Sequence, residues 1–223
     1  LLMEQLLQDK VMASQFLKQL DSEAKAFTFQ LFDDRKDRAD GSMAKILHGS
    51  LNSVWDELVI HNNNGGGVFV TINQTDLTGR RKENIVSIRA VFQEDDTKGE
   101  FDENGEINPL PLVPNIVVNS SKDNYHRYFL VVDMPIENFT PVQNRLIESY
   151  HSDPAVKDVS RVLRLPGFYH MKDPSDPYMV QMRSHDRDGN ELCTDIPYTS
   201  DEIELAFPPL DNSGKSNPKE AAL

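Results

Sequence analysis

The sequence predicts an α+β protein, because helical and strand periodicities alternate along the chain. Apolar residues recur at three- and four-residue spacing in residues 1–20, which is typical of an amphipathic helix. Residues 26–32 instead alternate apolar and polar side chains, and residues 85–89 do the same before the chain turns apolar, as strands do. A chain of 223 residues fits one large domain or two small lobes.

Further elements are predicted in order along the first half. Ser50 caps a helix over residues 51–60, and the Asn- and Gly-rich run 62–67 ends it. A strand over residues 68–73 is joined by a short loop to the strand over residues 85–96. We expect these two strands to be antiparallel neighbours. The polar run 33–42 between the first strand and this helix is expected to be a loop.

The second half adds a strand pair, helices and turns. Residues 115–121 and 125–132 read as paired strands. Thr140 and Gln143 form a capping box with proline between them, so a helix is predicted from Thr140 to about residue 150. Residues 154–160 favour a helical turn, and Pro166-Gly167 interrupts a strand over residues 162–170. A turn at residues 188–189 and a last helix over residues 200–207 follow.

Composition places the chain among ordinary proteins without membrane spans. Hydrophobic residues make up 38% and charged residues 26%, and no apolar run approaches the ~20 residues of a membrane helix. The first residues lack a basic region and a small-residue cleavage site, so we expect no signal peptide and a cytoplasmic location. The single cysteine, Cys193, excludes a disulfide framework and a thiolate zinc site within this chain.

The net charge of −13 argues against a passive nucleic-acid binder, whose affinity comes from lysine and arginine contacts to phosphate. It does not exclude an enzyme whose acids hold metal ions. The basic cluster Arg80-Arg81-Lys82 stands apart from the acidic runs. It could hold the phosphates of a nucleic-acid strand, and a solvated turn explains it about as well.

Three acidic residues end the strand over residues 85–96. Side chains at positions i and i+2 of a strand share a face, so Glu94 and Asp96 project together and Asp95 points the other way. Paired carboxylates suit Mg²⁺ or Mn²⁺. The plainer interpretation is a strand that runs into a solvated acidic loop, and the pattern E-x-D alone favours it.

Two further motifs follow in order. The first combines Ser121 and His126 on the predicted strand pair. The second begins at Asp153 and continues through Asp158, Arg161 and Arg164 into Leu165-Pro166-Gly167-Phe168, with Lys172 behind it. Each motif alone has an ordinary structural explanation: a histidine satisfied within a sheet, and a strand bulge at Pro-Gly.

Together, in this order and spacing, the three motifs resemble the archaeo-eukaryotic primase superfamily, and in particular the RepB-like primases and primase-polymerases of plasmids and phages. The resemblance covers roughly residues 25–185. Glu94 stands where the family commonly has aspartate, and the spacing from Ser121 to His126 is wider than a compact S-x-H motif.

The resemblance implies a two-lobed core with the site between the lobes, the second lobe having a sheet like that of an RNA-recognition motif. We expect three parts: an amino-terminal helix (1–24) from its periodicity, a primase-polymerase catalytic domain (25–207) from the resemblance, and a disordered tail or linker (208–223) from its composition. The resemblance has further implications for function. It implies DNA-directed synthesis in the replication of a plasmid, phage or other mobile element. The single-stranded template, nucleoside triphosphates and Mg²⁺ or Mn²⁺ would be its ligands.

The resemblance also implies roles for individual residues. The catalytic metal ligands would be Glu94, Asp96 and Asp158, with Asp153 as the alternative third ligand. Three clustered acids repel one another, so at least one pKa should rise without metal. Arg161 would order these carboxylates. The triphosphate would contact Ser121, His126, Arg164 and Lys172, although Arg164 could instead hold Asp158 in place.

Two rival functions remain. One is an inactive replication-initiation or origin-binding module, and the other is a metal-dependent nuclease, which also uses clustered acids. The sequence contains no helicase P-loop motif, so unwinding would come from a helicase in trans or on a further domain. The choice between ribo- and deoxyribonucleotides is not readable from these residues.

Overall fold

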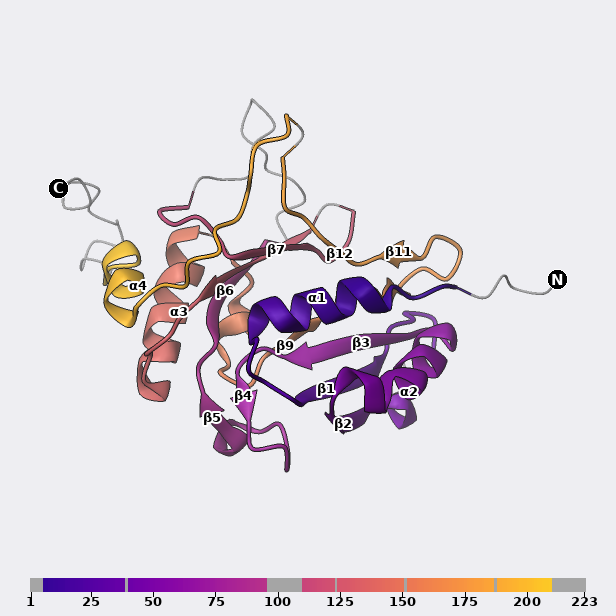
Figure 1. Ribbon diagram of the computed structural model, residues 1–223. Helices are drawn as coiled ribbons and strands as arrows, with labels where there is room; N and C mark the ends of the chain where they lie inside the picture. The colour runs from indigo at the N-terminus through magenta and orange to yellow at the C-terminus, as the bar shows by residue number, and fades with distance from the viewer. Residues whose placement is uncertain are drawn as a thin grey trace.

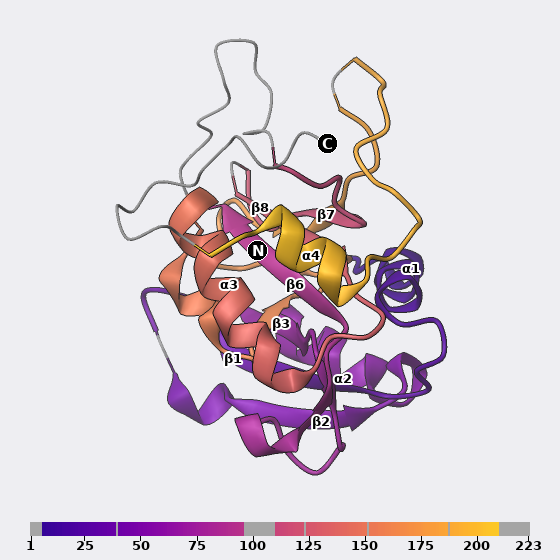
Figure 2. The same ribbon diagram turned by 90° about the vertical axis from the view of Figure 1, so that its left-hand side faces the viewer.

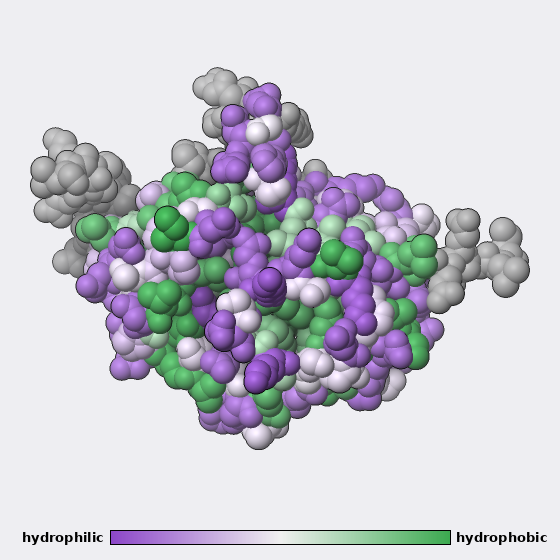
Figure 3. Space-filling view, viewed as in Figure 1, coloured by the Kyte–Doolittle hydropathy of each residue, from purple (hydrophilic) through white to green (hydrophobic). Residues whose placement is uncertain are grey.

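Two antiparallel four-stranded sheets organise the protein, which is therefore α+β as predicted. The computed structural model describes residues 6–38, 40–95, 110–122, 124–150, 152–186 and 188–209. Helix α1 lies between the two sheets in the view of Figure 1. On the face shown in Figure 3, apolar residues gather in small groups among polar ones. No described helix is long and apolar enough to cross a membrane.

The first sheet has the strand order β2-β1-β3-β9. Its strands are β1 (Phe27–Asp33), β2 (Lys45–Gly49), β3 (Gly66–Thr71) and β9 (Val162–Arg164). The alternating apolar residues of β1 are buried, and helix α2 (Leu51–Asn63) packs against β3 with Val54 and Leu58 in the core. Ser50 caps this helix by accepting a hydrogen bond from the backbone N–H of Ser53, as predicted.

The second sheet has the order β12-β7-β8-β6. Its strands are β6 (Ala90–Asp95), β7 (Ile116–Asn119), β8 (Tyr125–Leu130) and β12 (Gln181–Met182). Helices α3 (Ile136–Tyr150) and α4 (Ser200–Ala206) lie on one side of it (Figure 2). The edge strand β6 is protected there, because Gln143 of α3 exchanges two hydrogen bonds with the backbone of Phe92.

Short elements complete the chain. Two-residue strands pair as β10 (Tyr169–His170) with β11 (Tyr178–Met179), and β4 (Gln74–Thr75) pairs with β5 (Ile85–Ser87). The 3₁₀ turns are η1 (Gly41–Met43), η2 (Lys82–Asn84) and η3 (Pro154–Lys157). The last of these is the helical turn predicted over residues 154–160.

Helix α1 (Lys10–Leu20) packs on the second sheet and reaches the segment that follows β9. Its Phe16 packs edge-on against Tyr128 of β8, with the ring centroids 5.6 Å apart. At its other end, the backbone N–H of Asp9 donates to the carbonyl oxygen of Gly167 at 2.8 Å. Gly167 has φ 88°, and a Cβ there would lie 2.2 Å from the carbonyl oxygen of Asp9. The Pro-Gly step is therefore required for α1 to approach so closely.

Two predicted helix starts are wrong. The first helix begins at Lys10, because Asp9 caps it by accepting from the N–H of Met12. Helix α3 begins at Ile136 and not at Thr140, so Pro141 lies inside it. The missing N–H of Pro141 removes one hydrogen bond in the second turn, which the buried residues Phe139, Val142 and Leu146 outweigh.

The predicted pairing of the strands at residues 68–73 and 85–96 is also wrong. Strand β3 pairs with β1 and β9, and only the short β4 and β5 pair across the loop between them. The strand at residues 85–96 is broken before Ala90, where the N–H of Arg89 donates to the Asn73 side chain at 3.0 Å. This break moves the chain from the short β4–β5 pair to the second sheet. Strand β2 was not predicted, and Asp96 lies outside the described residues.

Candidate active site

Glu94 stands near the end of β6, directly opposite His126 of β8 in the strand register. Its Oε1 lies 3.4 Å from His126 Nε2, and its Oε2 accepts a hydrogen bond from Arg161 Nη2 at 2.9 Å. His126 is 2% exposed, so the carboxylate has a largely buried histidine on one side and a cation on the other. Strand pairing thus sets this contact, while Arg161 arrives from the segment before β9.

Residues 152–153 fasten that segment to the end of β6. The hydroxyl of Ser152 accepts from the N–H of Glu94 at 2.9 Å, and the N–H of Asp153 donates to the Glu94 carbonyl at 3.1 Å. Asp153 then caps η3 by accepting from the N–H of Ala155. Its Oδ2 lies 3.8 Å from Arg161 Nη2. Arg161 therefore bridges two carboxylates, Glu94 and Asp153.

The electrostatics of Glu94 differ from the repulsion expected for clustered acids. Burial alone would raise its pKa, but the hydrogen bond and charge of His126 and the charge of Arg161 together lower the pKa to about 2. Glu94 is therefore ionised at neutral pH. The expected rise of a pKa does not occur at this carboxylate, because its near neighbours are a histidine and an arginine.

Only some of the predicted metal ligands lie among the described residues. Among the described residues, no group of three or more His, Cys, Asp or Glu side chains is placed to hold a metal. Glu94 is an ionised oxygen donor of the type that Mg²⁺ and Mn²⁺ prefer. Asp96, its predicted partner, lies outside the described residues. Asp95 contributes nothing to this face, because its Oδ2 lies 3.5 Å from Arg127 Nη2 on the other side of the strand.

Among the described residues, the hydrogen bonds and ion pairs of the Asp158 side chain do not include Glu94 or Arg161. Asp158 Oδ1 accepts hydrogen bonds from the N–H and hydroxyl of Ser160, and the side chain is exposed. Arg80 approaches the same turn and donates to the carbonyl of Ser160 at 3.4 Å. Proximity to Glu94 thus favours Asp153 over Asp158, the two alternatives for a third carboxylate.

The three predicted template-binding bases do not share one surface. Arg80 turns inward and donates to Gln30 at 2.6 Å, and its burial lowers its pKa from the ordinary value, against the charge of Asp158. Arg81 and Lys82 are exposed, and Arg81 has Glu83 as a neighbour at 4.0 Å. Only two of the three bases are therefore open to solvent.

Arg164 pairs with Asp34 and not with Asp158. Two parallel hydrogen bonds of 2.7 and 2.8 Å join the guanidinium to the carboxylate, and the guanidinium lies over the ring of Phe69 at 4.7 Å. Asp34 also accepts from the N–H of Met171 at 2.8 Å. Arg164 therefore fixes the loop that carries Lys172.

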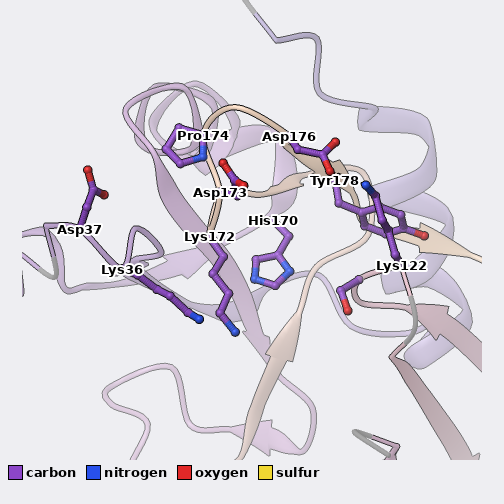
Figure 4. A pocket seen from close by; sticks show the side chains of 10 residues that line it. Lys36, Asp37, Lys122, His170, Lys172, Asp173, Pro174, Asp176 and Tyr178 are labelled. Atoms are coloured by element: carbon purple, nitrogen blue, oxygen red, sulfur yellow. Dashed lines mark hydrogen bonds and ion pairs between the residues drawn. The ribbon is translucent and has the colours of Figure 1, made fainter. Parts of the chain in front are cut away.

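A cavity of about 470 Å³ opens beside this loop (Figure 4). Its lining includes two residues predicted to bind a nucleotide, Ser121 and Lys172. It also includes three basic residues that the sequence did not single out as site residues: Lys36, Lys122 and His170. Lys36 lies in the polar run 33–42, where a charged side chain carries no positional signal. His126 and Arg164 are absent from its lining.

Some charged residues of the cavity form ion pairs with described residues, and others do not. Asp37 pairs with Arg35, and Asp176 pairs with Lys122, whereas Lys36 and Lys172 have no ion pair with any described residue. Burial and then the positive charge of Arg164 lower the pKa of His170 to about 4. His170 is therefore neutral at pH 7. The three lysines of the lining are balanced by the three aspartates Asp37, Asp173 and Asp176, and Lys36 and Lys172 are the lysines left without an ion pair to a described residue.

A comparison with protein families decides what kind of domain holds this site. Residues 56–196 match the family described as the RepB DNA-primase N-terminal domain, which is more than half of the chain. The chain belongs to this family. The resemblance inferred from the order of the three motifs is confirmed, and a role of DNA-primase type follows from it. No curated protein matches the chain.

Solved structures confirm the primase fold. The archaeo-eukaryotic primase domain of the primase-polymerase of cyanophage S-2L has a TM-score of 0.66 and 19% identity, over 91% of this chain and 100% of that one. The primase RepB′ has a TM-score of 0.56 and 19% identity, over 88% of this chain and 61% of that one. The catalytic domain of RepB′ in complex with initiator DNA has a TM-score of 0.54 and 19% identity, over 88% and 92%.

Proposed function

We propose that this primase domain performs template-directed nucleotidyl transfer on single-stranded DNA, joining nucleotides supplied as nucleoside triphosphates. The observation that carries the proposal is the ionised Glu94, which lies against His126 of β8 and against Arg161, while residues just after β7, the other neighbour of β8, line the cavity. Ser121 of the cavity follows Val118, the register partner of His126, by three residues. Ser121 lies just beyond the end of β7, and in this proposal one bound nucleoside triphosphate reaches from the cavity to His126.

In this proposal the cavity binds the triphosphate. Lys36 and Lys172 are unpaired point charges suited to phosphate oxygens, and Ser121 and the neutral His170 can donate hydrogen bonds to them. Arg164 acts through Asp34, which holds the loop before Lys172. We place His126 at the sugar and phosphate end nearest Glu94.

The carboxylates Glu94 and Asp96, with a third from Asp153 or Asp158, would hold Mg²⁺ or Mn²⁺. Divalent ions would supply charge stabilisation for the attacking hydroxyl and the leaving pyrophosphate. Arg161 keeps Glu94 ionised and aligned with Asp153. Ser152 and the strand pairing with β8 fix the backbone of Glu94, so its carboxylate is set in place before substrate arrives.

The two unpaired lysines favour this reaction over the nuclease alternative. A nuclease needs no pocket for a free triphosphate, whereas a polymerising enzyme does. The other alternative, an inactive origin-binding module, needs neither the ionised Glu94 nor the cavity. A helicase, in trans or on a further domain, is the partner we propose for this domain during replication.

The proposal is tested by incubating the domain with single-stranded DNA, Mn²⁺ and labelled ribo- or deoxyribonucleotides. We expect labelled, lengthened products from the parent, none from Glu94→Gln or Asp96→Asn, and normal products from the control Asp188→Asn on an exposed turn. Shortened oligonucleotides without incorporation would establish a nuclease. Nucleotide and DNA binding with no product under any metal would establish an inactive module.

A further inference from the structure

The loop of residues 76–84 joins β4 to β5 and projects from the body of the protein in both ribbon views (Figures 1 and 2). Its Leu77 has φ 61°, and no other described non-glycine residue has a positive φ. This left-handed conformation is strained for a leucine, because the side chain crowds the following carbonyl oxygen. Glycine or asparagine would occupy the position with less strain.

Packing does not explain why leucine stands there. The side chain of Leu77 is 40% exposed and belongs to no part of the buried core. A strained residue persists only where the surrounding structure fixes it, and such residues concentrate at binding sites.

Hydrogen bonds do fix the loop around Leu77. Asp76 Oδ1 accepts from both the N–H and the hydroxyl of Thr78 at 2.8 Å, and Asn84 donates to the same carboxylate. The N–H of Leu77 donates to the hydroxyl of Thr75 at 3.2 Å. The N–H of Arg81 donates to Asn84 at 2.9 Å. The loop therefore presents Leu77 in a set position.

The same loop carries bases outward and toward the candidate active site. Arg81 and Lys82 are exposed, while Arg80 reaches back to the carbonyl of Ser160, the residue before Arg161. A strand lying on the loop would thus pass from two exposed bases and an apolar side chain toward Glu94.

We propose that residues 76–84 form a rigid template-holding loop, in which Leu77 packs against an unstacked base of single-stranded DNA while Arg81 and Lys82 contact its phosphates. The inference rests on the proposed function, since it takes the bound strand to be the template. Proteins that bind the minor groove insert apolar side chains, leucine among them, between base steps that they partly unstack, and we apply the same contact to a base of the single strand. The loop also exposes Asp76 and Glu83, and Arg81 lies 4.0 Å from Glu83, so Lys82 is its exposed base without an ion pair to a described residue. The reach of Arg80 toward the segment that carries Arg161 favours the bound template strand over an apolar protein partner.

The test measures stability and DNA affinity in the same variants. Leu77→Asn relieves the strained φ, so its melting temperature should rise by about 2 °C. Its Kd for a fluorescent single-stranded oligonucleotide of mixed sequence, measured by anisotropy, should increase about fivefold. Leu77→Ala keeps the strain and should lose the same affinity without the gain in stability. Leu205→Asn, at another exposed leucine on α4, should leave the affinity unchanged.

A salt series distinguishes the contribution of Leu77 to DNA affinity from the contributions of Arg81 and Lys82. An apolar contact releases no counterions, so Leu77→Asn should weaken binding equally at all salt concentrations, with the slope unchanged. An unchanged Kd in both Leu77 variants would overturn the inference and leave a protein as the candidate occupant of the loop. A changed slope would also overturn it, because phosphate contacts would then have moved. The binding assay contains no metal ion or triphosphate. Its result therefore does not depend on whether the domain incorporates nucleotides.

Discussion

The guanidinium of Arg161 joins Glu94 and Asp153, lying 2.9 Å from the first carboxylate and 3.8 Å from the second. These acids come from different elements, β6 and the start of η3, and the backbone contacts of residues 152–153 hold the two elements together. One arginine therefore offsets two negative charges at the end of a strand. The hydrogen bond and charge of His126, followed by the charge of Arg161, explain how this largely buried carboxylate keeps a lowered pKa and stays ionised.

Replacing Glu94 should destabilise the protein at neutral pH. Its pKa is lowered from 4.5 to about 2, so its ionised form stabilises the fold above pH 4.5 and this stabilisation is lost as the pH falls toward 2. The shift corresponds to at most ~3 kcal/mol. Urea unfolding of Glu94→Gln should show a lower free energy at pH 7 and a weaker dependence on pH between 4.5 and 2.

Asp158→Asn is the control for that measurement, because Asp158 is exposed and contacts no cation at hydrogen-bond distance among the described residues. Equal stability of Glu94→Gln and the parent at pH 7 would contradict the role of Arg161 and His126. For Asp96, the expectation from clustered acids still stands: Asp96→Ala should abolish synthesis and leave thermal stability similar or higher.

The two candidates for the third carboxylate give opposite expectations. If Asp153 completes the set, Asp153→Asn should reduce nucleotide incorporation on the order of 100-fold, the upper range for losing a group that supports a metal site. Asp158→Asn should then change it little, because asparagine can still accept the hydrogen bonds from Ser160. Primer extension at saturating Mn²⁺ measures both. The reverse ranking would assign the role to Asp158.

Lys36 and Lys172 should contribute mainly to nucleotide affinity. Each is an unpaired cation on the cavity, so Lys36→Ala and Lys172→Ala should each raise the Kd for a nucleoside triphosphate about tenfold, or ~1.4 kcal/mol. Their affinity for single-stranded DNA should change far less. Lys45→Ala, an exposed lysine paired with Glu57, is the control. Equal losses for DNA and nucleotide would move the triphosphate out of this cavity.

Sequence reasoning succeeded where local chemistry decides the structure. The Ser50 cap, the β7–β8 pair and the break at Pro166-Gly167 depend on residues within a few positions of one another. The transfer of the chain between sheets depends instead on Arg89, whose backbone binds Asn73 and whose side chain pairs with Asp21. Such partners lie 16 and 68 residues away and leave no periodic signal.

The candidate site shows the same limit. Motif order was enough to single out Glu94, His126 and Arg161, because strand pairing and a short connection bring them together. It could not choose between Asp153 and Asp158, since both lie in one turn and only the contact through Arg161 separates them. Lys36 was missed because it reaches the cavity from a polar run, residues 33–42, in which seven of the ten residues are charged.

Salt dependence should distinguish Arg80 from its two neighbours. Each phosphate contact contributes about −0.7 to the slope of log affinity against log salt on single strands, so Arg81→Ala with Lys82→Ala should flatten it by up to ~1.4. Arg80 is turned inward onto Gln30 and the carbonyl of Ser160. Arg80→Ala should therefore leave the slope nearly unchanged and instead lower stability, because Gln30 and Ser160 lose a buried partner. Anisotropy across a salt series, with and without Mg²⁺, measures the slopes. A slope that flattens for Arg80→Ala alone would show that Arg80 swings outward to bind phosphate, and an unchanged slope in the double variant would place the template near Arg161, Arg164 and Lys172.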